Sequence, residues 1–152
     1  MNSLHVERFD EITGVGAIAA QELIAEIGAD VTRFPSPPHL VSWAKFAPID
    51  KNSAGRKRGG STGKGNPWLA GTLGEIVASA SRTDTFLGER YRRLARRRGT
   101  SRAIVAVGNS VLTIIWHLLA DPEARYLRVS TLRASAPATT VRPKAGGLAF
   151  PR

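Results

Sequence analysis

Cysteine is absent from the 152 residues, and methionine occurs only once. The lack of cysteine excludes a disulfide scaffold, a Cys-ligated zinc site and a thiol nucleophile. The three histidines, His5, His39 and His117, are isolated in the sequence, and the acidic residues form no obvious metal-binding set. We therefore expect neither a metal site nor a bound cofactor in this chain.

Acidic residues are also scarce, because 12 Asp and Glu stand against 22 Lys and Arg, a formal net charge of +10. Residues 51–102 hold 13 basic and 3 acidic residues, and the net charges of the segments on either side cancel. A positive charge focused in this way predicts a binding surface for an anionic partner. Nucleic acid is the first expectation and an anionic membrane the second.

An uninterrupted hydrophobic run is lacking as well. The most apolar stretch, residues 103–120, is shorter than the about 20 residues of a typical membrane-spanning helix. It also contains Asn109, Ser110 and His117, so a buried core helix is favoured over a membrane span. The N-terminus shows no secretory signal. We expect a soluble cytoplasmic protein with no membrane partner.

Helical patterns dominate what is present, and no pair of strands is evident. Turn and capping residues divide the chain into expected helices at 17–27, 39–46, 67–81, 85–98, 101–120 and 121–128. The expected fold is a small all-α domain over 1–128, with a helix-hairpin-helix unit at about 6–28, a Gly/Arg/Lys-rich loop at 50–66 and helices over 67–128. Residues 129–152 lack periodicity, which predicts a disordered tail.

The sequence Ile-Thr-Gly-Val-Gly at residues 12–16 is the first candidate binding motif. A dinucleotide-binding turn would need a hydrophobic strand before it, whereas the preceding residues are polar. In a helix-hairpin-helix unit, Gly14 and Gly16 would permit a tight turn whose N–H groups face a phosphate. A turn without a ligand remains the alternative, and Asp10 and Glu11 would repel phosphate.

Residues 50–66 contain five glycines and five Lys or Arg residues but almost no apolar side chain. The segment resembles a nucleotide-binding P-loop only in part. That pattern needs glycine where Arg58 stands and a hydroxyl residue where Gly65 stands. Nucleotide hydrolysis is therefore rejected.

Ser53 is the candidate nucleophile of this loop. A flexible serine beside Arg56, Lys57 and Arg58 could attack a phosphodiester while the cations neutralise charge on the phosphoryl oxygens. Basic loops with a serine are common, however, and composition alone favours a loop that only binds the nucleic-acid backbone. No neighbouring base can be named from the sequence.

A cationic stripe is expected on the helix at 85–98, where Arg90, Arg93 and Arg97 share one face. Such a stripe follows a phosphate backbone. No helix carries the mixture of Asn, Gln and Arg that reads bases in the major groove.

Four segments in this order resemble one family. They are ITGVGAIAAQELIAEIG, RFPSPPHLVSWAKFAP, the stretch from NSAGRKRGGSTGKGN through RYRRLARRRG, and AIVAVGNSVLTIIWHLL. Together they are similar to the C-terminal transposase domain of bacterial insertion-sequence transposases of the DEDD, serine-dependent, bridge-RNA-guided class, over about residues 9–126.

The resemblance implies that Ser53 attacks the DNA backbone and forms a covalent protein–DNA intermediate. Arg56, Lys57, Arg58 and Lys64 would contact the nucleic acid around it. Mg²⁺ would be held by carboxylates of an N-terminal RuvC-like domain. The implied partners are DNA, a guide RNA, and a RuvC-like catalytic half or a full-length homologue; a homo-oligomer is compatible with the sequence.

The chain also departs from the family pattern. It begins just before the helix-hairpin-helix, so we expect a truncated copy that lacks the metal-binding half and is inactive alone. Thr13 stands where proline is usual, Lys45 where glycine is usual, and the last 25 or so residues do not resemble a family ending. A split protein with a separate catalytic half, a non-catalytic nucleic-acid-binding protein and a non-functional remnant remain the alternatives.

Overall fold

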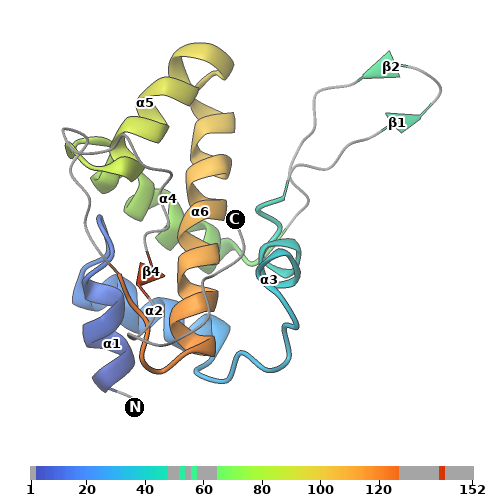
Figure 1. Ribbon diagram of the computed structural model, residues 1–152. Coiled ribbons are helices and arrows are strands. Elements are labelled where there is room, and N and C mark those ends of the chain that lie inside the picture. Colours follow the sequence, from blue (N-terminus) through green and yellow to red (C-terminus); the bar gives the residue numbers. More distant parts are fainter. Residues whose placement is uncertain (1–2, 48–51, 54–55, 58–64, 127–140, 143–152) are drawn as a thin grey trace.

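The computed structural model describes residues 3–47, 52–53, 56–57, 65–126 and 141–142. Helices make up most of these residues, which confirms the expected small all-α domain (Figure 1). The helices are α1 (Ser3–Asp10), α2 (Ala17–Ile27), α3 (Pro37–Trp43), α4 (Pro67–Ser81), α5 (Phe86–Arg98) and α6 (Thr100–Ala120). Two short antiparallel pairs join β1 (Asn52–Ser53) to β2 (Arg56–Lys57) and β3 (Arg125–Tyr126) to β4 (Val141–Arg142).

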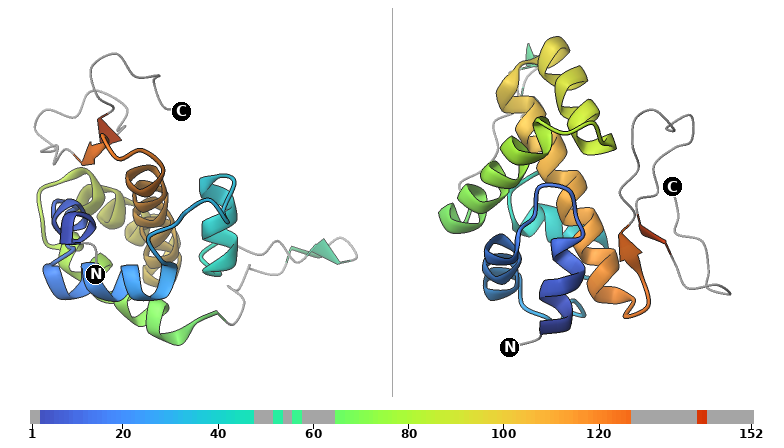
Figure 2. Two further views of the ribbon diagram at one scale, coloured as in Figure 1. Left: turned by 90° about the horizontal axis from the view of Figure 1, so that it is seen from below. Right: turned by 90° about the vertical axis from the view of Figure 1, so that its left-hand side faces the viewer.

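The central element is α6, against which α1, α3, α4 and α5 pack, while α2 packs on α1 and α4 (Figure 2). By length and composition, α6 is the one helix in the described part of the chain that could cross a membrane, and half of its most apolar stretch is buried inside the structure. The sequence prediction of a core helix is confirmed. The buried residues of α6 are Ala103, Val107, Gly108, Val111, Leu112, Ile114, Ile115, Leu118 and Leu119.

Two helices begin and end where the sequence predicts, because their ends are fixed locally. Gly28 ends α2 with a φ of +87°, which favours glycine, and its N–H donates to the carbonyl of Ile24. Asn66 precedes α4, and its side-chain oxygen accepts from the backbone N–H groups of Trp68 and Leu69. A single glycine, Gly99 with a φ of +88°, separates α5 from α6.

The short helix α3 ends three residues earlier than the predicted range of 39–46. The chain turns at Lys45, which adopts a φ of +61°, a left-handed conformation that favours glycine. The turn directs Phe46 into the core, where its side chain is buried and its N–H donates to the carbonyl of Val41.

The predicted helix at 121–128 is wrong for the residues described there, since a turn and strand β3 follow α6. Arg8 of α1 holds this turn: its Nη2 donates to the carbonyls of Asp121 at 2.7 Å and Ala124 at 2.6 Å, and its Nε donates to Ala124 at 3.2 Å. The Arg8 side chain is almost fully buried. We call this contact the Arg8 clamp.

Strand β3 then pairs with β4, so Arg125 lies opposite Arg142 and Tyr126 opposite Val141. This pairing places two residues of the expected disordered tail, 141–142, in a defined strand. The other residues of the 129–152 tail lie outside the described residues, and their predicted disorder stays a prediction.

Replacing Arg8 with Met should lower the free energy of unfolding by about 2–4 kcal/mol, because the buried carbonyl of Ala124 and the partly buried carbonyl of Asp121 lose their charged donor. Urea unfolding followed by circular dichroism measures this loss. The matched control is Arg125→Met, which removes the ion pair between Arg125 and Glu11. Because the Arg125 side chain is largely exposed, this substitution should lower the free energy of unfolding by less than about 1 kcal/mol. Equal losses in the two variants would show that the Arg8 clamp is not a principal contact.

Candidate nucleic-acid interface

Strands β1 and β2 place the backbone of Ser53, the predicted nucleophile, beside the backbone of Arg56, one of the predicted phosphate-binding residues. The register pairs Ser53 with Arg56 and Asn52 with Lys57. Figure 1 shows the two strands projecting away from the helices. Arg58 and Lys64 lie outside the described residues, so their contacts stay predictions.

The two ends of the basic loop meet on the helical body, at a place that we call the loop root. Gly65, the first described residue after the loop, packs against Ala44 and Lys45 before it. A Cβ at Gly65 would lie 2.9 Å from the carbonyl oxygen of Ala44 and 3.0 Å from Cβ of Lys45. Contacts this short leave no room for a side chain, so glycine permits the chain to leave and return at one point.

Two carboxylates of α2 attach the loop root and α4 to the body. The Asn66 side-chain amide donates to the Glu26 carboxylate, and Thr72 Oγ1 donates to Glu22 Oε2 at 2.7 Å. Sequence reasoning missed both glutamates, because the partners lie 40 and 50 residues away along the chain. Both side chains accept hydrogen bonds from α4 and its N-cap.

Phe46 fixes the other side of the loop root. Its ring packs on Gly108 of α6, where an added Cβ would lie 2.5 Å from Phe46 Cε1. The absence of a side chain at Gly108 therefore creates the notch that holds the ring. This notch sets where the chain leaves α3 toward the basic loop.

The predicted phosphate-binding turn lies between α1 and α2, at residues 11–16. Gly14 has a φ of +86° and packs against α4, since a Cβ there would lie 2.5 Å from the carbonyl oxygen of Ile76. Glycine at this position serves helix packing. Gly16 is exposed, with open space where its Cβ would be. Phosphate binding by the turn stays a prediction.

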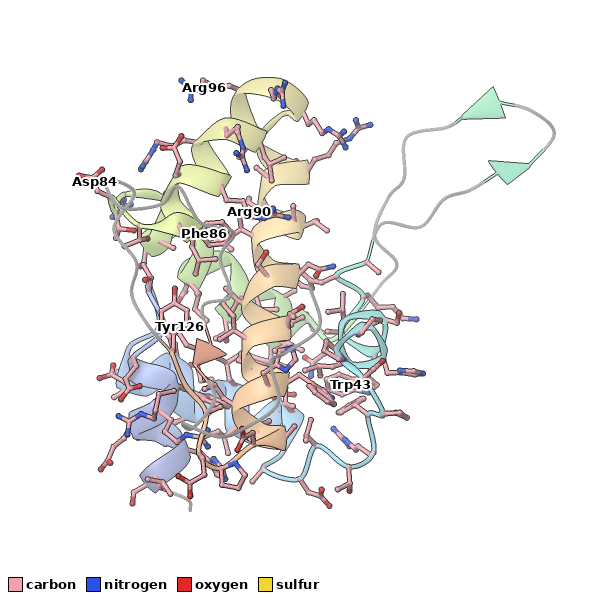
Figure 3. The ribbon with its side chains drawn as sticks, viewed as in Figure 1. Trp43, Asp84, Phe86, Arg90, Arg96 and Tyr126 are labelled. Carbon is pink, nitrogen blue, oxygen red and sulfur yellow. The ribbon has the colours of Figure 1, made fainter. Side chains whose placement is uncertain are left out.

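The predicted stripe of Arg90, Arg93 and Arg97 is divided by the structure. Arg93 and Arg97 are exposed, whereas Arg90 is half-buried near α6 (Figure 3). Burial, together with the charge of Arg93, lowers the pKa of Arg90. Its Nε is buried and has no hydrogen-bond partner among the described residues. Arg90 therefore faces the protein more than the solvent.

Exposed cations gather instead where α5 meets α6, at the end of the molecule that Figure 3 marks by Arg96. We call this surface the arginine tip; it consists of Arg93, Arg96, Arg97, Arg98 and Arg102. None of the ion pairs found among the described residues involves a tip arginine. Sequence reasoning found two of the five, because it followed one helix face and not the turn at Gly99.

Arg92 has a structural role. Its Nη1 donates to the carbonyls of Ser81 at 2.9 Å and Thr83 at 3.0 Å, at the C-terminal end of α4. Its Nη2 lies 3.3 Å from Glu89 Oε2 and 3.8 Å from Asp84 Oδ1. These contacts hold α5 to the end of α4, so the charge of Arg92 is compensated within the protein.

Within the described residues, no three His, Asp or Glu side chains lie together as a metal site requires. The family resemblance assigns Mg²⁺ to a RuvC-like domain and not to these residues, and Mg²⁺ binding stays a prediction. We assign no step of the chemistry to a metal held by these residues.

Comparison with protein families relates the chain to transposases. The sequence model described as the "Transposase IS116/IS110/IS902 family" matches residues 6–92, more than half of the chain. The matched region runs from α1 into α5 and includes the basic loop. No curated protein matches the chain.

Filling the notch at the loop root should destabilise the protein. Alanine is favoured over glycine within a helix by about 1 kcal/mol, yet Gly108→Ala should lower the free energy of unfolding by about 1–3 kcal/mol, because the new methyl displaces Phe46. Gly74→Ala is the matched control, since a Cβ there meets nothing within 4 Å; it should raise stability by about 0.5–1 kcal/mol. Thermal or urea unfolding measures the stability of both variants. If both substitutions stabilise the protein, Phe46 does not need the space above Gly108.

Proposed function

The chain belongs to the IS116/IS110/IS902 transposase family, and on this basis we propose that it binds the DNA backbone and supplies the serine nucleophile of transposition. The arginine tip is the observation that carries the proposed DNA binding. Transposases act on DNA, and five exposed guanidinium groups at one end of the molecule suit a polyanion. Arginine pairs with phosphate oxygens through two parallel hydrogen bonds.

Backbone contacts of this kind carry no sequence information. We propose that a guide RNA supplies the specificity through base pairing. The basic loop with Arg56, Lys57, Arg58 and Lys64 would form a second backbone contact, around the reacting phosphate. We further propose a cytoplasmic location and a RuvC-like catalytic half as the protein partner.

In the proposed reaction, Ser53 Oγ attacks a backbone phosphorus, and the bond from phosphorus to a deoxyribose oxygen breaks. The serine loses its proton, the leaving oxygen gains one, and a phosphodiester between serine and DNA replaces the phosphodiester within the DNA strand. A DNA hydroxyl then reverses the exchange and joins a new pair of strands. The pairing of Ser53 with Arg56 in the strand register supports this assignment, because it places a cation's backbone beside that of the nucleophile.

Nucleic-acid binding should depend strongly on salt. If six cations contact phosphates, the logarithm of the binding constant should fall with log[salt] at a slope of roughly −5. Arg97→Ala should make the slope shallower by about 0.9, whereas Arg125→Ala, at the other end of α6, should leave it unchanged. Fluorescence anisotropy with a DNA duplex measures these slopes. If binding is undetectable or independent of salt, the proposed contact with the DNA backbone is wrong. That outcome would favour the alternative of a non-functional remnant.

Ser53 should form a covalent adduct with DNA when the RuvC-like half, a guide RNA and a cognate site are supplied. Denaturing electrophoresis and mass spectrometry of the adduct identify the residue. Ser53→Ala should abolish the adduct, and Ser61→Ala, in the same loop, is the control that should retain it. An adduct that survives in Ser53→Ala and disappears in Ser61→Ala would assign the role to Ser61. No adduct from the unmodified chain would favour the alternative, a non-catalytic nucleic-acid-binding protein.

A further inference from the structure

Trp68, in the first turn of α4, is the most exposed large hydrophobic residue of the described chain, with 78% of its surface accessible. Its backbone is nevertheless fixed. The Trp68 N–H donates to Asn66 Oδ1 at 2.9 Å, and Asn66 is held in turn by Glu26. Pro67 lies between Asn66 and Trp68, and its ring fixes its φ angle at a helical value. A rigid backbone therefore presents a large apolar ring to solvent.

The described positions three and four residues from Trp68 provide no side chain that covers this ring. Residues three positions before and after Trp68 are Gly65 and Gly71, and a Cβ at Gly71 would meet nothing within 4 Å. Thr72, four positions after, is buried and bonds to Glu22. Side chains on a helix lean toward the preceding turn, and Gly71 has no side chain that could extend over the indole.

Trp43 shows the opposite situation. Its ring lies 5.4 Å from that of Phe34, and the Arg33 guanidinium lies 5.1 Å from its centroid. These contacts occupy the Trp43 ring within the protein, and only 39% of the residue is exposed. Trp43 is therefore a matched internal control for Trp68.

The surroundings of Trp68 favour an anionic partner. The basic segment 51–64 ends four residues before Trp68 in the sequence. Lys45, an exposed cation, packs against Gly65 at the loop root. An aromatic ring beside cations is the combination by which proteins bind single-stranded nucleic acid, with the base on the ring and the phosphate near the cations.

We propose that Trp68 is a stacking platform for one unpaired base of the bound nucleic acid. Bases within a duplex already stack on their neighbours, so only an unpaired base offers a free face to the indole. Trp68 would thus distinguish single-stranded from duplex segments, whereas the arginine tip accepts both. This inference rests on the proposed function, since it presupposes that the chain binds nucleic acid.

The test uses the full chain with a labelled 20-nucleotide single strand and with the duplex of the same sequence, at one low salt concentration. Trp68→Ala should weaken single-strand binding about 5- to 150-fold, the range for loss of one stacked base, and change duplex binding by less than about twofold. Trp68→Phe should retain most of the single-strand affinity, whereas Trp68→Leu should behave as Trp68→Ala. Trp43→Phe should change neither affinity.

Single-strand binding should also quench tryptophan emission in the unmodified chain and in Trp43→Phe, but not in Trp68→Phe.

Thermal unfolding of each variant verifies that the fold is retained. Unchanged single-strand binding in Trp68→Ala, or an equal loss toward both ligands, would overturn the platform. Full affinity in Trp68→Leu would indicate an apolar contact surface, such as one for a protein partner, and would also overturn it. If the unmodified chain binds neither ligand, the proposed function fails and the inference with it.

Discussion

Burial of α6 is the constraint on which the rest of the structure depends. Four of the other five described helices pack directly on it. Its ends are joined to the body by different means: at one end Gly99 connects it to α5 through a single residue. Beyond the other end, the Arg8 clamp fixes the turn that follows. Between the two ends, Gly108 holds Phe46 and so anchors the chain that leads into the basic loop.

This arrangement places two separate basic elements on one small body. The arginine tip lies where α5 meets α6, whereas the loop root lies where α3 approaches the start of α4. Several charged side chains hold these elements in position through hydrogen bonds. Glu22 and Glu26 bind α4 and its N-cap, and Arg92 bonds to the end of α4.

Local signals in the sequence were sufficient for much of the fold. The bounds of α2 and α4 follow from Gly28, Asn66 and Pro67, which act on the backbone next to them. The C-terminal end predicted for the helix at 39–46 and the helix predicted at 121–128 were wrong, because distant residues decide those segments. Phe46 turns inward to meet Gly108, 62 positions later, and Arg8 captures the carbonyls after α6 from the other end of the chain.

The candidate site could be predicted in its residue types more than in its geometry. The basic composition around Ser53 is visible in the sequence, but its pairing with Arg56 is a matter of strand register. Helix periodicity predicts the arginine stripe from α5 alone and contains no information on neighbouring helices. Packing of α5 against α6 leaves Arg90 half-buried. Arg102 joins the tip only because α5 and α6 meet at Gly99.

The length of α6 also sets a distance. A helix of 21 residues extends roughly 30 Å, with the arginine tip at its beginning and the Arg8 clamp just after its end. A nucleic-acid strand bound at the tip, as proposed above, would therefore lie about one domain width away from the Arg8 clamp. Substitutions at the tip would then change the affinity for that strand, whereas the distance from the tip to the Arg8 clamp is set by the length of α6.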